Sequence, residues 1–120
     1  MSKHVSVYAS AARTATPTAV TVPTGRYQYM HIVTDVTAAA ATPSVIMTID
    51  ALDTVSGKYY NLLTSAAFDQ TVATRTLKIG PGLPVTANVS ANDIVPSTIR
   101  ITMTHGDADS ITYTVGVHLF

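Results

Sequence analysis

Hydrophobic and polar residues alternate most regularly in the last part of the chain. Ile111, Tyr113, Val115, Val117 and Leu119 take every second position, and threonine, glycine and histidine fill the positions between them. A period of two predicts a β-strand with one buried face. Residues 98–104 alternate in the same way, and the turn-forming residues 106–109 separate the two runs. The pattern predicts an antiparallel hairpin over residues 97–119.

Further short apolar runs predict more strands along the chain. Residues 45–52 and 58–63 flank the turn sequence 53–57 and predict a second hairpin. Residues 45–52 are apolar at nearly every position, which is typical of a strand covered on both faces. Strands are also predicted around 27–33 and 71–79. With the alternating N-terminal valines, the count is about seven or eight strands, which favours an all-β antiparallel β-sandwich of immunoglobulin-like or jelly-roll type.

Two segments do not fit this regular pattern. Residues 10–25 are small, rich in threonine and nearly uncharged, so we expect residues 1–25 to form an extended N-terminal arm or first strand. Residues 26–120 would then form the sandwich domain. Residues 80–96 contain three prolines and alternate only weakly. They predict a long ordered loop across one end of the sandwich, and loops of that length often contact partners.

Composition supports the all-β prediction and limits the possible partners. Thr, Val and Ile make up 42 of the 120 residues, and β-branched side chains favour strands over helices. Lys and Arg together balance Asp at seven each, and Glu is absent. With no basic surplus, we expect neither nucleic acid nor an anionic membrane as a partner. The chain has no cysteine, so it forms no disulfide.

The candidate chemistry is sparse. His105, Asp107 and Asp109 lie close together, but a hairpin turn selects Asp and Gly for backbone reasons alone. The other histidines, His4, His31 and His118, show no metal-ligand spacing within one predicted strand, although neighbouring strands could bring them together. No nucleophile motif is present. We therefore expect no enzyme activity, cofactor, metal or small-molecule substrate.

Four tyrosines leave one binding function open. Tyr27, Tyr29, Tyr59 and Tyr60 could form a stacking platform for a sugar. Alternation places Tyr27 and Tyr29 on one face but separates Tyr59 from Tyr60, so at least one of the four is expected in the core. A carbohydrate-binding adhesion module is the alternative function from a different class.

Three segments carry a resemblance to a known family. They are DTVSGKYYNLLTS at 53–65, LKIGPGL at 77–83 and STIRITMTHGDADSITYTVG at 97–116. Together they resemble small virion structural proteins of tailed bacteriophages, common in phages of actinobacteria. The resemblance implies a non-enzymatic virion protein, and within that class we favour a capsid decoration protein. A tail-associated or head-tail connecting protein is the alternative within the virion.

A decoration protein would bind the major capsid protein and itself, as a trimer or similar oligomer, on the capsid surface after assembly in the host bacterial cytoplasm. Low charge permits dense packing of copies. The candidate interface residues come from the N-terminal segment and the 80–96 loop: Val5, Val7, Arg13, Val20, Val22, Leu83, Val85 and Val89.

Overall fold

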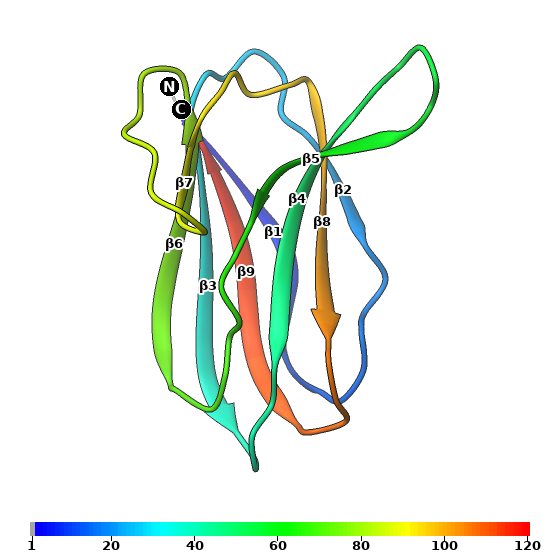
Figure 1. Cartoon of the computed structure of the whole chain (residues 1–120), viewed down its shortest axis with the longest axis vertical. Helices are drawn as coiled ribbons and strands as arrows, with labels where there is room; N and C mark the ends of the chain where they lie inside the picture. The colour runs from blue at the N-terminus through cyan, green and yellow to red at the C-terminus, as the bar shows by residue number, and fades with distance from the viewer. Residues whose placement is uncertain (1) are drawn as a thin grey trace.

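Nine strands form two facing sheets in the computed structural model, which describes residues 2–120 (Figure 1). The strands are β1 (Lys3–Arg13), β2 (Val20–Pro23), β3 (Met30–Ala39), β4 (Val45–Leu52), β5 (Tyr59–Thr64), β6 (Ala73–Gly80), β7 (Ser90–Asn92), β8 (Thr98–His105) and β9 (Ile111–Leu119). One sheet has the order β1-β9-β3-β6-β7 and the other β2-β8-β4-β5. All neighbours are antiparallel except β6 and β7. The predicted all-β sandwich is confirmed, and residues 2–120 contain no helix that could cross a membrane.

The alternating positions of β8 and β9 fill the space between the sheets. Ile99, Ile101 and Met103 of β8 are fully buried, as are Tyr113 and Val117 of β9. These residues belong to one continuous apolar core. Removal of this apolar surface from water is the main force that holds the sheets together.

The predicted hairpin over residues 97–119 is wrong, because β8 and β9 lie in different sheets. β8 pairs with β2 and β4, whereas β9 pairs with β1 and β3. Residues 106–110 cross from one sheet to the other. Alternation shows only that each strand has one buried face, and two strands that face each other across a core have the same pattern as two strands of a hairpin.

The second predicted hairpin is confirmed, with Leu52 opposite Tyr59 in the β4–β5 pair. Asp53 organises its turn by accepting hydrogen bonds from the Val55 amide and the Ser56 hydroxyl. β4, however, is buried only at every second residue, and Ile46 on its outer face is 39% exposed. The expected cover on both faces is wrong, because this sheet packs on one side only.

The N-terminal residues differ from the expected extended arm. β1 runs along β9, and β2 runs along β8, so each forms an edge strand of one sheet. Residues 3–13 therefore match the first-strand alternative. Residues 14–19 connect the two edge strands and are the part of residues 3–23 that forms no strand. The small side chains of this region suit close strand pairing. The low-complexity sequence, however, has no pattern that would predict this pairing.

The strand predicted around 27–33 begins later, at Met30, and continues to Ala39. Before it, the amides of Gln28 and Tyr29 donate to the carbonyl of Phe120. The predicted 80–96 loop contains the short strand β7 and otherwise lies at the end of the sandwich that also carries both termini and the β4–β5 turn (Figure 1).

Candidate interaction surface

The four valines among the candidate interface residues of β1 and β2 face the core. Val22 is 0% exposed, Val7 is buried, and Val5 and Val20 pack partly buried against the core. Val7 and Val22 thus have no free surface to offer a partner in this structure. Their alternation marks the inner faces of β1 and β2.

Arg13 holds an irregular part of the β1–β9 pair together. The pairing register shifts between Tyr8 and Ala11, which leaves a bulge in β1. The Arg13 guanidinium donates to the carbonyls of Ala9 at 2.7 Å, Ala11 at 3.1 Å and Tyr113 at 3.0 Å. It also lies over the Tyr113 ring, 4.6 Å from its centroid. Arg13 therefore satisfies main-chain acceptors inside its own sheet, and this use of the side chain competes with an interface role.

Segment 81–95 presents the exposed apolar residues. Val85 is 71% exposed, Ile94 70% and Val89 43%, whereas Leu83 is partly buried. The segment thus carries an exposed Ile94 as well as Leu83, Val85 and Val89, and the sequence analysis did not single out Ile94. The only sequence feature that could have indicated the exposure of Ile94 is its place beside Asp93 in a segment without alternation.

Side-chain hydrogen bonds fix the shape of segment 81–95. The Ser90 hydroxyl donates to the Pro84 carbonyl at 2.7 Å and accepts from the Thr86 amide at 2.9 Å. The Asn92 side chain accepts from the Gly82 amide at 2.8 Å. Asn88, in the left-handed region at φ 62°, donates to the Thr64 carbonyl. The segment is thus tied to both sheets, and its valines are held in a defined arrangement.

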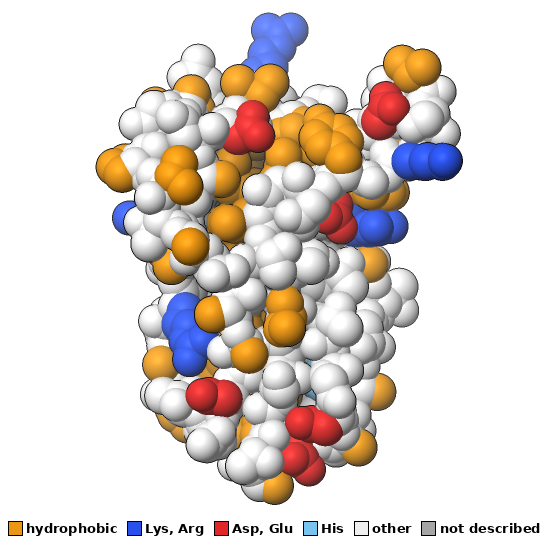
Figure 2. All heavy atoms as spheres, viewed as in Figure 1, with side chains coloured by type: hydrophobic (Ala, Val, Ile, Leu, Met, Phe, Trp, Pro, Cys, Tyr) orange, Lys and Arg blue, Asp and Glu red, His pale blue; other side chains and the backbone are white. Residues whose placement is uncertain are grey.

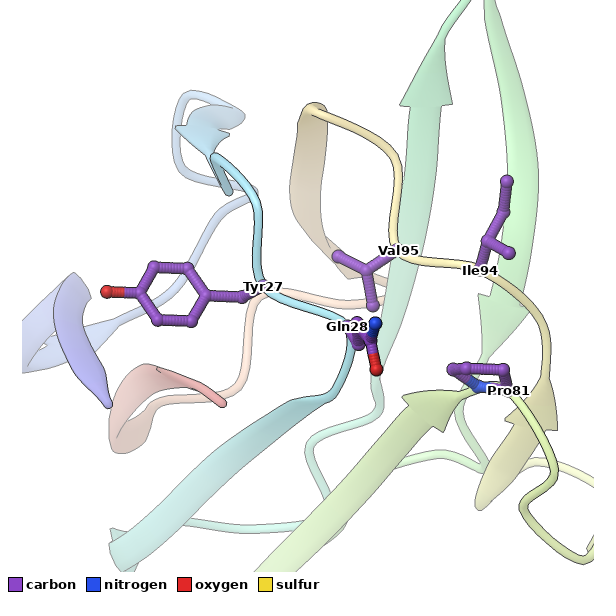
Figure 3. Close-up of a pocket in the computed structure, with 5 residues that line it drawn as sticks. All are labelled: Tyr27, Gln28, Pro81, Ile94 and Val95. Atoms are coloured by element: carbon purple, nitrogen blue, oxygen red, sulfur yellow. The ribbon is translucent and has the colours of Figure 1, made fainter. Parts of the chain in front are cut away.

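A shallow hollow of about 190 Å³ lies at this end of the sandwich. Gln28, Pro81, Ile94 and Val95 surround it, and the Tyr27 ring points away from these four residues (Figure 3). Its lining carries no charged side chain. A hollow of this kind suits an apolar side chain from a partner rather than a polar substrate.

A larger groove of about 400 Å³ lies on the other side of the same segment. Phe68, Leu77 and Val89 form its apolar part, and Arg75 borders it. The Arg75 guanidinium lies over the Phe68 ring and donates to the Ala67 carbonyl. In Figure 2, hydrophobic side chains gather around the end of the molecule that carries these loops, with an acidic side chain among them and other charged side chains around them.

The turn after β8 confirms the backbone role expected for its carboxylates. Asp107 accepts from the Asp109 amide, and Asp109 accepts from the Thr42 amide. His105 instead bonds to the buried Tyr113 hydroxyl, with 3.0 Å between Nε2 and the oxygen. Burial lowers the pKa of His105, and the nearby Arg13 adds to this effect while Asp107 opposes it. Burial also raises the pKa of Tyr113 to about 12.

Three histidines lie in one row across the larger sheet, an arrangement that depends on register and was not visible in the sequence. His4 of β1 is opposite His118 of β9, which is opposite His31 of β3, and Lys78 of β6 follows. The Nδ1 atoms of His4 and His118 are 2.6 Å apart. The His31 ring packs against the Phe120 ring instead, with 5.0 Å between centroids. Within residues 2–120, no three metal-ligating side chains converge in their present orientations.

The tyrosines do not form one platform. The Arg100 guanidinium lies 3.8 Å from the centroid of the Tyr59 ring and covers one face of it. Tyr29 packs over Gly80 and donates to the Pro81 carbonyl. Tyr60 is half exposed. The two most exposed rings, Tyr29 and Tyr60, therefore belong to different local environments.

Comparisons with known proteins show a fold and no family. No family model matches the sequence, and no curated protein matches it. Among solved structures, a chain of the T13 particle of infectious bursal disease virus is similar, with a TM-score of 0.54 and 8% identity. The match covers 99% of this chain and 30% of that chain. A chain of the Gt strain of this virus gives a TM-score of 0.52 and 8% identity over 99% of this chain and 32% of that one. The protein thus spans about a third of the chains that share its sandwich fold.

Proposed function

We propose that this protein is a non-enzymatic structural component of a virus particle. The observation that carries the proposal is the similarity of nearly the whole chain to part of a chain from an icosahedral viral particle. The exposed apolar residues of segment 81–95 support it, because a stable protein contact needs a defined apolar centre. The zero net charge favours it as well, since copies packed side by side repel each other little.

Within that class, we propose a decoration protein on the capsid of a tailed bacteriophage. The three sequence segments that resemble small phage virion proteins support this choice. The protein would bind the major capsid protein, self-associate as a trimer or similar oligomer, and assemble in the bacterial cytoplasm. Segment 81–95 is the proposed contact, with Val85, Val89 and Ile94 at its centre. Val5, Val20 and Leu83 would contribute only through their partly exposed surface.

The copy number of the protein in the particle tests the decoration role. A decoration protein is present at hundreds of copies on the capsid surface, whereas a tail-associated or head-tail connecting protein is present at about a dozen copies or fewer. Cryo-electron microscopy of virions with quantitative mass spectrometry distinguishes the two. Fewer than about twenty copies, or density confined to the tail, would contradict decoration.

A binding measurement tests the proposed contact. The variant Val85→Ser/Val89→Ser/Ile94→Ser is expected to bind heads that lack the protein at least about tenfold more weakly, because centrally buried side chains dominate interfaces. The control is Val72→Ser, which removes an exposed valine near the opposite end of β6. Equal binding of the triple variant and the control in co-sedimentation would exclude segment 81–95. Binding to a glycan array with no binding to heads would instead support the carbohydrate-binding alternative.

A further inference from the structure

The row of histidines across the larger sheet brings two imidazoles into direct contact. His4 is exposed on edge strand β1, and His118 is partly exposed on β9, next to it in the sheet. Their rings meet edge to face with 4.7 Å between centroids. The 2.6 Å between the two Nδ1 atoms is a hydrogen-bond distance, so the two nitrogens face each other, and each is of a kind that binds metal ions.

From this geometry we propose that His4 and His118 form a binding site for a divalent transition-metal ion of the zinc type. Zinc binds imidazole nitrogen at about 2.0–2.1 Å, which in a tetrahedral site places two nitrogens about 3.3 Å apart. The two rings need to separate by less than one ångström, and the exposed His4 side chain can move. Zinc would lie between the two Nδ1 atoms, each ring would carry its proton on Nε2, and water would complete the coordination.

His31 supplies a third ligand from the neighbouring strand. It is directly opposite His118, and Cβ atoms of such pairs are about 4.5–5.5 Å apart. Its ring now packs on the exposed Phe120, and rotation of the side chain toward His118 would break that contact. Lys78 is the next residue in the row, and its flexible side chain can extend away from the ion.

Zinc at this position would fasten β1 to β9. The two ligands are 114 residues apart in the sequence, and β1 is held in its sheet only by β9. An ion bound to both strands stabilises the folded state by mass action. The site does not depend on the proposed virion role.

Calorimetric titration of the untagged protein with zinc chloride tests the site. We expect one saturable binding step per chain, and at 100 times the measured Kd the unfolding equilibrium constant should fall about 100-fold. His4→Ala and His118→Ala should each abolish the step, and His31→Ala should weaken it. His105→Gln is the matched control, because His105 lies outside the row and bonds to Tyr113. Magnesium, which prefers oxygen ligands, should not bind.

Two results would overturn the proposal. One is the absence of saturable zinc binding to the wild type at millimolar zinc. The other is wild-type affinity in His4→Ala, whose exposed position makes it the variant least able to disturb the fold. Unchanged affinity in His31→Ala would remove His31 from the ligand set. Imidazole NMR signals of His4 and His118 that shift together on addition of zinc would support direct coordination.

Discussion

The Arg13 side chain bridges the irregular part of the β1–β9 pair. Its guanidinium donates to three main-chain carbonyls and packs on Tyr113. Arg13→Ala should lower the free energy of unfolding by about 1–3 kcal/mol, because hydrogen bonds from a charged group are lost, including the part-buried one to the Tyr113 carbonyl. Arg13→Lys should recover little of this loss, since an ammonium lacks the planar fork.

Urea unfolding measures the effect of these Arg13 substitutions. Arg26→Ala is the matched control, because Arg26 is exposed. A loss in Arg13→Ala no larger than in Arg26→Ala would contradict the structural role of Arg13.

Substitution of Thr34, in contrast, is expected to raise the free energy of unfolding. Thr34 is a buried residue of β3, and its hydroxyl has no hydrogen-bond partner among residues 2–120. Thr34→Val replaces the hydroxyl by a methyl group of similar size, so it should raise the free energy of unfolding by about 1–2 kcal/mol. Thr114→Val, on the outer face of β9, is the control and should change stability little. Destabilisation by Thr34→Val in thermal and urea unfolding would show that the hydroxyl has a partner.

For single residues, the sequence predicted which positions belong to an apolar strand face, but it did not predict what those side chains contact. Val7 and Val22 alternate as strand residues do, but alternation alone does not say whether the apolar face meets the core or a partner. The position of Arg13 in a bulge depends on a register shift that no local pattern shows. Asp53 is the contrasting case, since its turn function follows from its own neighbours.

At the scale of elements, the end of β6 packs closely against the residues before β3. A Cβ atom on Gly80 would overlap the Tyr29 ring and lie 2.8 Å from its Cε1 atom. Gly80→Ala should therefore displace the ring and cost about 1–3 kcal/mol of stability, as overpacking does. In a Tyr29→Ala background the same substitution should cost less, by about 1 kcal/mol or more. A double-mutant cycle by urea unfolding measures this coupling, and additive effects would contradict the contact.

The strands themselves could be predicted from the sequence, but their assignment to sheets could not. Period-two patterns located β8 and β9 to within a few residues, and short apolar runs located β4 and β6. The pairing of β4 with β5 was predictable because a short turn joins them. The separation of β8 and β9 into different sheets was not predictable, because the same alternate residues are buried whether the two strands pair in one sheet or face each other. The histidine row has the same origin, since it follows from pairing between strands far apart in the sequence.

At the scale of the whole molecule, buried titratable groups limit the pH range of stability. The lowered pKa of His105 means that the folded state binds a proton less readily than the unfolded state, whose histidine titrates near 6.5. Stability should fall as the pH drops below about 6.5. The raised pKa values of Tyr113 and Tyr8 act in the opposite direction, so stability should fall as the pH rises from about 10 toward 12.

Urea midpoints measured across pH test both limits. His105→Gln should flatten the acidic side of the profile, and Tyr113→Phe should reduce the alkaline loss without removing the share due to Tyr8. Asp53 and Asp69 also have lowered pKa values, because they accept hydrogen bonds, so they act on the profile at lower pH than His105 does. An acidic limb unchanged by His105→Gln would assign the loss to other groups.

The position of β9 between β1 and β3 determines the order in which the sandwich can form. Among the described strands, β1 pairs only with β9. β1 therefore has no sheet partner until residues 111–119 have been synthesised. Up to residue 110 the larger sheet lacks the strand that joins its two parts. Such distant pairing slows folding, because long loops must close before their contacts contribute. During synthesis the β1 segment is thus open to premature association with other copies.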